Sequence, residues 1–308
     1  MKFLAWLSLC CAVALAQQIA DSSFEPPLGR DPKHKAGSGP RVLLDEAHSN
    51  FHTSEGRYLA CTKLLRRDGY TVDPNKLPFT RKNLGGAGVL IIANALHADN
   101  AKDWNLPRQS AFTPAEVAEL QSWIHDDGGS LLLIADHMPF AGAAAVLGKA
   151  LGVEFNDGYA ADPRGGGLPD LFTRENGGLR DHEVTSGIPS IGTFTGSAFR
   201  FLPGHNGAPI LVLGPQFVSV KPKVIGRADP DTPKEPIGGW LQGAVLSSGK
   251  GRGAIFGEAA MFSAQLAGPN KQPVGMNHPK AEYNHRLLLN VIAWLAAGST
   301  SPLPRAAK

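Results

Sequence analysis

Acidic and imidazole side chains gather where the first apolar run of the chain ends. The run Val42-Leu43-Leu44 leads directly into Asp45-Glu46-Ala47-His48-Ser49-Asn50-Phe51-His52. Two later runs end in the same way: Leu90 to Ala93 leads into Asn94 and His97, and Leu131 to Ala135 leads into Asp136-His137. Open α/β sheets bind their ligands at the carboxyl ends of the strands. If these runs are parallel neighbours, their polar ends converge on one edge of a sheet, and we expect a site there.

Carboxylates beside imidazoles can perform general acid–base chemistry. A metal-free hydrolase would use Asp136 or Glu46 as the base with a histidine partner. The side chains expected to take part in catalysis are Asp136, His137, Glu258 and Glu46. The side chains expected to bind the ligand are Asp45, Asn50, Asn94, His97 and His285.

A divalent metal is a second use of the same residues. His48 and His52 are four positions apart and would share one face of a helix. Imidazole nitrogens and carboxylate oxygens are ligands for zinc and similar ions. The chain matches no named metal motif, so the cofactor stays open. The structural alternative is that Asp136 caps a following helix and His137 bonds a tight turn.

The bulk composition is that of an ordinary globular protein. The 308 residues are 43% hydrophobic and 19% charged, and the formal net charge is +3. So small a charge does not favour a nucleic-acid or anionic-membrane partner, and a small molecule or a carbohydrate is the expected ligand.

The N-terminus has the pattern of a secretory signal peptide. Lys2 precedes an apolar stretch from Phe3 that ends in Ala14-Leu15-Ala16, a small-x-small cleavage site. Residues 1–16 are therefore expected to be removed, giving a secreted or periplasmic protein without a membrane span. The alternatives are a retained N-terminal anchor and a lipoprotein attached through Cys10 or Cys11, which lacks the usual small residue before the Cys.

Cleavage would leave Cys61 as the one cysteine of the mature chain. It shares a helical pattern with Leu64 and Leu65, which favours a buried structural thiol over a nucleophile.

The elements alternate in the first half of the chain. Residues 17–39 resemble a linker, and residues 40–298 are expected to form one domain. Strands are predicted near 41–46, 70–72, 88–95 and 130–135, and helices over 57–67, 113–127 and 141–151. The second helix has a capping box of Thr113 and Glu116. This alternation predicts a mostly parallel, doubly wound sheet with helices on both faces.

The second half is less regular and richer in glycine. Residues 156–208 are expected to form an irregular, β-rich lid insertion. Strand candidates follow at 191–195, 210–213, 218–226 and 242–248, and a terminal helix at 281–297. Residues 299–308 resemble a disordered tail.

The layout resembles the class I glutamine amidotransferase-like superfamily, and within it the exported DUF4350-like branch. The resemblance spans residues 41–297. It rests on the polar cluster at 45–52 and on the segments 112–137, 257–263 and 284–290. It implies a flavodoxin-like α/β fold.

The chain departs from that superfamily at the catalytic elbow. Active members place a Cys after the central strand, whereas this chain reads Ile134-Ala135-Asp136-His137-Met138-Pro139. The expected His two residues before Glu258 is also missing. Because Asp cannot replace a thiolate nucleophile, we do not expect glutamine hydrolysis. Two hypotheses remain: a secreted hydrolase with an Asp/His/Glu site, and a non-catalytic domain that binds a ligand or carbohydrate.

We predict cleavage after Ala16, with Gln17 as the mature N-terminus, because the small-x-small pattern ends there. Intact-mass measurement of protein from its native host tests this. Retention of residues 1–16 would contradict it.

Overall fold

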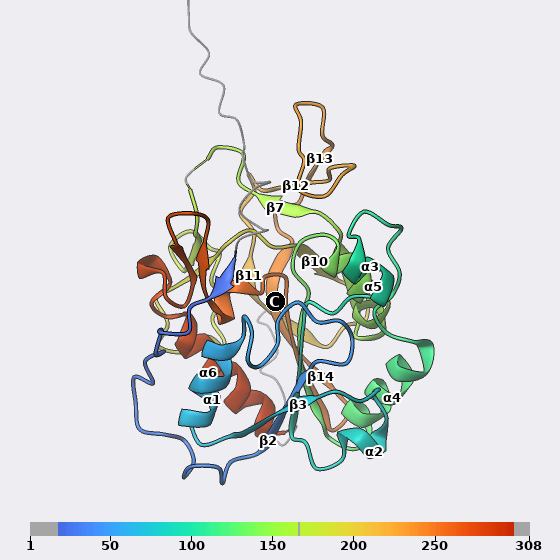
Figure 1. The fold of residues 1–308 in the computed structure, drawn as a ribbon, viewed down its shortest axis with the longest axis vertical. Coiled ribbons are helices and arrows are strands. Elements are labelled where there is room, and N and C mark those ends of the chain that lie inside the picture. Colours follow the sequence, from blue (N-terminus) through green and yellow to red (C-terminus); the bar gives the residue numbers. More distant parts are fainter. Residues whose placement is uncertain (1–17, 166, 299–308) are drawn as a thin grey trace, which may run out of the picture.

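The computed structural model describes residues 18–165 and 167–298 (Figure 1). Within them, a nine-stranded sheet forms the centre of a mixed α/β fold. Its parallel part is consistent with a flavodoxin-like fold, and its strands lie side by side in the order β3 (Thr71–Asn75), β2 (Arg41–Asp45), β4 (Val89–Ala93), β5 (Ser130–Ile134) and β15 (Gly251–Phe256).

The register confirms the predicted neighbours. Leu44 of β2 pairs with Ile91 of β4, and Ile92 pairs with Leu133 of β5, in parallel pairs. Every residue of β4 and β5 is buried. Unbroken apolar runs are typical of parallel strands that are covered on both faces, so this part of the sheet follows directly from the sequence.

Antiparallel strands extend the sheet beyond β15. β14 pairs with β15 and also with two other strands, and the outermost strand pairs with β10. These strands are β14 (Leu241–Ser248), β10 (Ala198–Phe201), β11 (Gly207–Val212) and β6 (Val153–Asn156). The expected strands at 210–213 and 242–248 fall in β11 and β14, while that at 218–226 is only three residues long in the structure.

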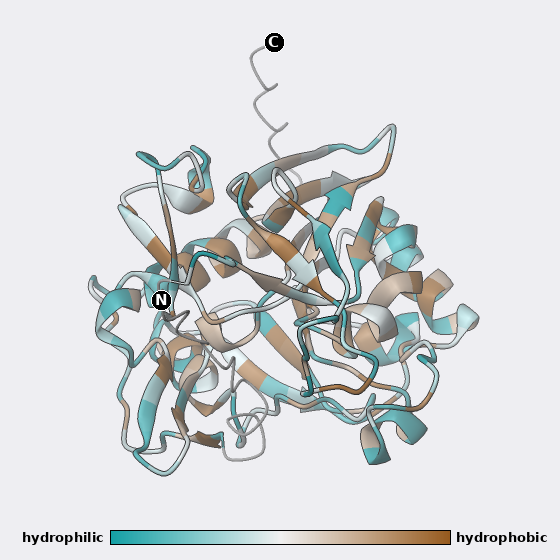
Figure 2. Cartoon of the chain, turned by 90° about the horizontal axis from the view of Figure 1, so that it is seen from above, coloured by the Kyte–Doolittle hydropathy of each residue, from teal (hydrophilic) through white to brown (hydrophobic). Residues whose placement is uncertain are grey.

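Helices cover the two faces of the parallel strands. In Figure 1, α1 (Leu59–Arg67) and α6 (Asn284–Ala296) lie on one side of the sheet. The other side carries α2 (Arg81–Leu84), α4 (Pro114–His125) and α5 (Phe140–Ala150). A short helix, α3 (Ala98–Lys102), follows β4. Figure 2 shows apolar stretches inside the molecule and polar loops around them.

The irregular second half contributes small sheets and turns. Residues 156–208, expected as a lid, contain a hairpin but also β10, which belongs to the main sheet. The remaining strands are β7 (Tyr159–Ala161), β12 (Val218–Val220) and β13 (Lys234–Pro236) in one sheet, β8 (Asp170–Thr173) and β9 (Ser190–Thr193) in the hairpin, and β1 (Ile19–Ala20), β16 (Ala264–Ala267) and β17 (Gln272–Gly275) in a third group. The 3₁₀ turns are η2 (Glu183–Thr185), η3 (Ala260–Phe262) and η4 (Pro279–Ala281).

The segment expected as a linker packs against the domain. β1 pairs with β16, and Arg30 forms a 2.7 Å ion pair with the buried carboxylate of Asp68. Arg67 also donates to the carbonyl of Pro26. The expected signal peptide and tail lie outside the described residues. In the part of the chain that the structure describes, no helix has the length and apolar character needed to cross a bilayer.

Leu133→Ala is expected to lower the free energy of unfolding by about 2–5 kcal/mol, because it removes a side chain that is 1% exposed and leaves a cavity. Urea denaturation measures the change. Val146→Ala on α5 is the matched control, since Val146 is 50% exposed and its loss should change stability little. Equal effects of the two substitutions would contradict the buried central position of β5.

Candidate functional site

His48 is held between two carboxylates at the carboxyl end of β2. Its Nδ1 lies 2.9 Å from Oδ2 of Asp45, and its Nε2 lies 2.9 Å from Oε1 of Glu116. The rings of Phe79 and Phe112 pack on the imidazole. His48 is 9% exposed and Asp45 is fully buried, so these contacts form in a largely dry environment.

The capping box of α4 places Glu116 there. Its backbone N–H donates to Oγ1 of Thr113, and its Oε2 accepts the backbone N–H of Thr113. The other carboxylate oxygen, Oε1, remains for His48 and for the backbone N–H of Phe79. Burial alone would raise the pKa of Glu116, but its hydrogen bonds with Thr113 and His48 outweigh burial and lower the pKa to about 2.

Burial also opposes the charged form of His48. The hydrogen bonds and charges of Asp45 and Glu116 outweigh that effect and raise the pKa of His48 above its ordinary value. The Asp45–His48–Glu116 cluster therefore favours a protonated ring with a carboxylate at each nitrogen.

A second cluster lies at the ends of β5 and β15. Oδ2 of Asp136 accepts, at 3.2 Å, the backbone N–H of Ala259, the residue that follows Glu258. Oδ1 of Asp136 accepts the backbone N–H of His137. Burial, together with the charge of Asp136, raises the pKa of Glu258 well above its usual range. Glu258 is therefore a carboxyl group that retains its proton more readily than an exposed one.

His137 and His52 lie around this acid pair. Nδ1 of His137 bonds the carbonyl of Met138 at 2.7 Å, and its ring stacks on Tyr159. His52 is 3% exposed, and neither of its ring nitrogens has a hydrogen-bond partner among the described residues. Burial lowers the pKa of His52 to about 3, and the nearby charges of Arg57 and His137 act in the same direction. His52 is therefore neutral.

Tyr58 connects His52 to the acid pair. The two rings are 4.7 Å apart, and the Tyr58 hydroxyl donates to the carbonyl of Ala259. Burial raises the pKa of Tyr58 well above its ordinary value, and the charges of Glu258 and Asp136 add to that effect. The hydroxyl thus remains a donor.

The segment before β10 covers this cluster. Gly196 has a φ of +97°, and a Cβ atom there would stand 2.4 Å from the carbonyl oxygen of Gly257. Oγ of Ser197 donates to the carbonyl of Ala135. Only glycine fits this approach of the covering loop to the end of β15.

Three other predicted site residues hold the surrounding loops. Glu46 accepts hydrogen bonds from the backbone N–H and the hydroxyl of Ser54. Oδ1 of Asn50 accepts the backbone N–H of His48. Asn94, with a φ of +53°, accepts the backbone N–H of Asp136 on its side chain and that of Phe51 on its carbonyl. Asn94 therefore links the loop after β2 to the end of β5.

The two remaining predicted ligand residues lie elsewhere. His97 is the N-cap of α3, and its Nδ1 accepts the backbone N–H of Asp99. His285 lies near the N-terminus of α6, where a Cβ atom on Gly29 would stand 3.5 Å from its Nε2. No hydrogen bond in the described structure joins either imidazole to the Asp45–His48–Glu116 cluster or to Asp136 and Glu258.

The two histidines considered as metal ligands have different surroundings. Both ring nitrogens of His48 contact carboxylates, and the segment that carries His48 and His52 is a series of turns, not the helix that would align them. Across residues 18–165 and 167–298, no group of three or more His, Cys, Asp or Glu side chains is arranged to hold a metal ion.

Sequence reasoning did not assign Tyr58 or Glu116 to the site. The sequence predicts Glu116 as part of a capping box, but its Oε1 contacts His48, 68 positions earlier in the chain, and no local spacing indicates that contact. Tyr58 directly precedes α1 and had no distinguishing pattern around it.

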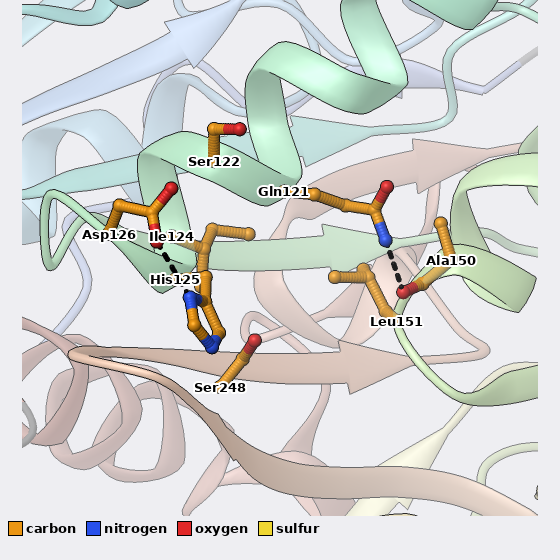
Figure 3. Close-up of a pocket in the computed structure, with 8 residues that line it drawn as sticks. All are labelled: Gln121, Ser122, Ile124, His125, Asp126, Ala150, Leu151 and Ser248. Atoms are coloured by element: carbon orange, nitrogen blue, oxygen red, sulfur yellow. Dashed lines mark hydrogen bonds and ion pairs between the residues drawn. The ribbon is translucent and has the colours of Figure 1, made fainter.

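A separate cavity of about 300 Å³ lies at the opposite edge of the parallel strands (Figure 3). Its lining includes the C-terminal residues of α4 and α5, and Figure 3 shows His125 and Ser248 beside it. It contains none of the predicted site residues. An adjoining cavity of about 220 Å³ shares Ala150, Leu151 and Ser248 with it.

Comparison with known proteins shows a similarity of fold. No protein-family model matches the chain, and no curated protein matches it. Among solved structures, the mmIFT52 N-terminal domain superposes with a TM-score of 0.59 at 17% identity, over 84% of this chain and 99% of that domain. At this identity the likeness shows the fold alone.

ThuA-like proteins are also among the structural neighbours. One from Bacteroides uniformis gives a TM-score of 0.48 at 16% identity, over 85% of this chain and 94% of its own. One from Parabacteroides merdae gives a TM-score of 0.44 at 13% identity, over 87% of this chain and 94% of its own.

We predict that Cys61 takes no part in catalysis. It is 1% exposed in the middle of α1, and burial raises the pKa of its thiol to about 12, so the nucleophilic thiolate is suppressed. Cys61 of the native protein, followed by peptide mass mapping, should react with a thiol reagent only as fast as the protein unfolds, and Cys61→Ser should retain any activity. Rapid labelling without denaturant, or loss of activity in folded Cys61→Ser, would contradict this.

Proposed function

We propose that the carboxyl end of β5 and β15 binds a neutral ligand rich in hydroxyl or amide groups, and that the protein is a hydrolase acting on it. The supporting observation is that the two ring nitrogens of buried His52 find no hydrogen-bond partner within residues 18–165 and 167–298. A buried polar group without a partner costs about 1–3 kcal/mol, so a position that retains two of them is explained by a ligand that satisfies them.

The chemistry of His52 indicates the kind of ligand. A neutral imidazole offers one N–H donor and one acceptor nitrogen. A hydroxyl group or a primary amide matches both, whereas a carboxylate or an ammonium ion matches only one. Sugars, polyols and amides therefore fit this side chain better than charged ligands do.

His137 supplies the base in this proposal. Its Nδ1–H donates to the Met138 carbonyl, which leaves Nε2 as the acceptor of the neutral ring. Such a nitrogen can take a proton from water as that water attacks a substrate, and Asp136 next to it would stabilise the resulting imidazolium. In the same cluster, burial and the charge of Asp136 raise the pKa of Glu258, so this carboxyl group gives up its proton less readily than an exposed one.

The scaffold in this proposal is that of the glutamine amidotransferase-like superfamily, doubly wound, without its thiol chemistry. The order of the parallel strands supports the scaffold, and the Asp136-His137 elbow, which carries no Cys, supports the loss of the thiol chemistry. Cys61 offers no replacement nucleophile because it is buried within α1. We further propose that the protein is exported after loss of residues 1–16 and acts outside the cytoplasm.

A non-catalytic binding domain is the second candidate. All four oxygens of the acid pair accept backbone N–H groups: those of His137, Ala259, Ala260 and Met261. Carboxyl groups with these partners hold two turns in place. This structural role alone accounts for them, without a catalytic one. In that case the same ligand would bind without turnover.

Substitutions at His52 and His137 should affect binding, stability and turnover differently. His52→Leu should weaken ligand binding yet raise the free energy of unfolding by about 1 kcal/mol, because it replaces an unsatisfied polar ring by an apolar side chain of similar size. His137→Gln should reduce turnover by about 10²–10⁴-fold with binding retained. Binding is measured by calorimetry with neutral sugars and amides, and turnover with 4-nitrophenyl esters and glycosides.

His125→Leu is the matched control, because His125 is an exposed histidine at the opposite edge. It should change neither binding nor turnover. Binding without turnover in the wild type would support the second candidate. If His52→Leu binds as the wild type does, or destabilises the fold, the His52 site is wrong.

A further inference from the structure

We propose that Asp45, His48 and Glu116 form a proton-dependent clamp that holds the loop of residues 46–58 and so positions His52 and Tyr58. His48 is a positioning residue in this view. The link between the clamp and ligand binding rests on the proposed function, but the clamp itself can be tested without a ligand.

With both acids ionised, the geometry requires a proton on each ring nitrogen. Nδ1 faces the Asp45 carboxylate at 2.9 Å and Nε2 faces the Glu116 carboxylate at 2.9 Å. An ionised carboxylate only accepts hydrogen bonds, and a neutral imidazole has a single N–H. The neutral ring would therefore place a lone pair against a carboxylate oxygen, whereas the imidazolium bonds both.

Glu116 is an acceptor in this arrangement. Its two oxygens also accept the backbone N–H groups of Thr113 and Phe79. A protonated Glu116 would lose part of that acceptor capacity, so the shared proton belongs on His48.

The clamp joins separate parts of the fold to the loop. Asp45 ends β2, Glu116 lies in the first turn of α4, and the carbonyl of His48 accepts the backbone N–H of Leu96 after β4. His52 follows His48 by four residues in this loop and lies at the ends of β5 and β15. Release of His48 would free the start of that loop from α4.

The charged groups that face His48 are few. Asp45 on β2 and Glu116 on α4 contact it, and the neutral rings of Phe79 and Phe112 cover it. Because the folded pKa of His48 is raised, the stabilisation is complete below the ordinary value of about 6.5 and is lost as the pH rises through the folded pKa. At the acid end, the clamp fails as the pH falls towards the Glu116 pKa of about 2.

Hydrogen exchange across residues 46–58 and at the Leu96 amide, corrected for intrinsic rates, tests the clamp between pH 6 and 9. In the wild type, protection should fall by about tenfold per pH unit between the ordinary and the raised pKa of His48. In His48→Gln, protection should be low and independent of pH. His125→Gln, which removes an exposed histidine paired with Asp126, should behave as the wild type.

Glu116→Gln provides the second variant, since the amide has nearly the shape of the carboxylate and removes its charge, while one acceptor oxygen remains. In this variant, the pH at which the loop loses its hydrogen-exchange protection should be lower than in the wild type. The titration midpoint of the His48 ring, measured by NMR, should fall with it. A His48 midpoint at or below about 6.5, or loop protection that does not change with pH, would overturn the clamp. If the clamp is present but calorimetry finds no ligand, the proposed function fails and the clamp stands.

Discussion

The parallel pairing of β2, β4, β5 and β15 determines where this protein can place polar chemistry. The middle two of these strands are buried along their whole length, and helices pack on both sides of them. A charged side chain inside such strands would lose its hydration without gaining partners. The carboxyl ends are the first positions at which Asp45, Asn94, Asp136 and Glu258 can find backbone N–H groups, and there they do.

These ends carry two clusters with different roles. Asp45 and Glu116 satisfy both nitrogens of His48, so that cluster is complete as it stands. Around Asp136 and Glu258 the acids are satisfied by turns, but His52 is not. A polar network in which every group has a hydrogen-bond partner needs only a role in stability. A network that leaves a buried group without a partner indicates that a ligand supplies one. This contrast is the reason for assigning ligand binding to one cluster and positioning to the other.

The sequence predicted the parallel strands well because their signal is local. Unbroken apolar runs followed by capped helices admit few arrangements, so the strands that carry Leu43, Ile91 and Leu133 could be expected to be parallel neighbours. The antiparallel half was predicted less well because its strands are short and its pairings join distant segments, such as β6 with β10. In the site, strand ends identified Asp136 and Glu258. The contact of Glu116 with His48 depends on how α4 packs, and no residue spacing encodes that.

The late position of β15 in the chain has a consequence for folding. β5 is synthesised early, and it pairs with β4 on one side. Its neighbour on the other side, β15, begins only at Gly251. Until then, a nascent chain holds an apolar strand with an unpaired edge, a surface prone to pairing with other chains. The pairing of β1 with β16 joins segments that are still further apart in sequence. High contact order of this kind slows folding, so we expect the chain to depend on a holdase while it is being synthesised.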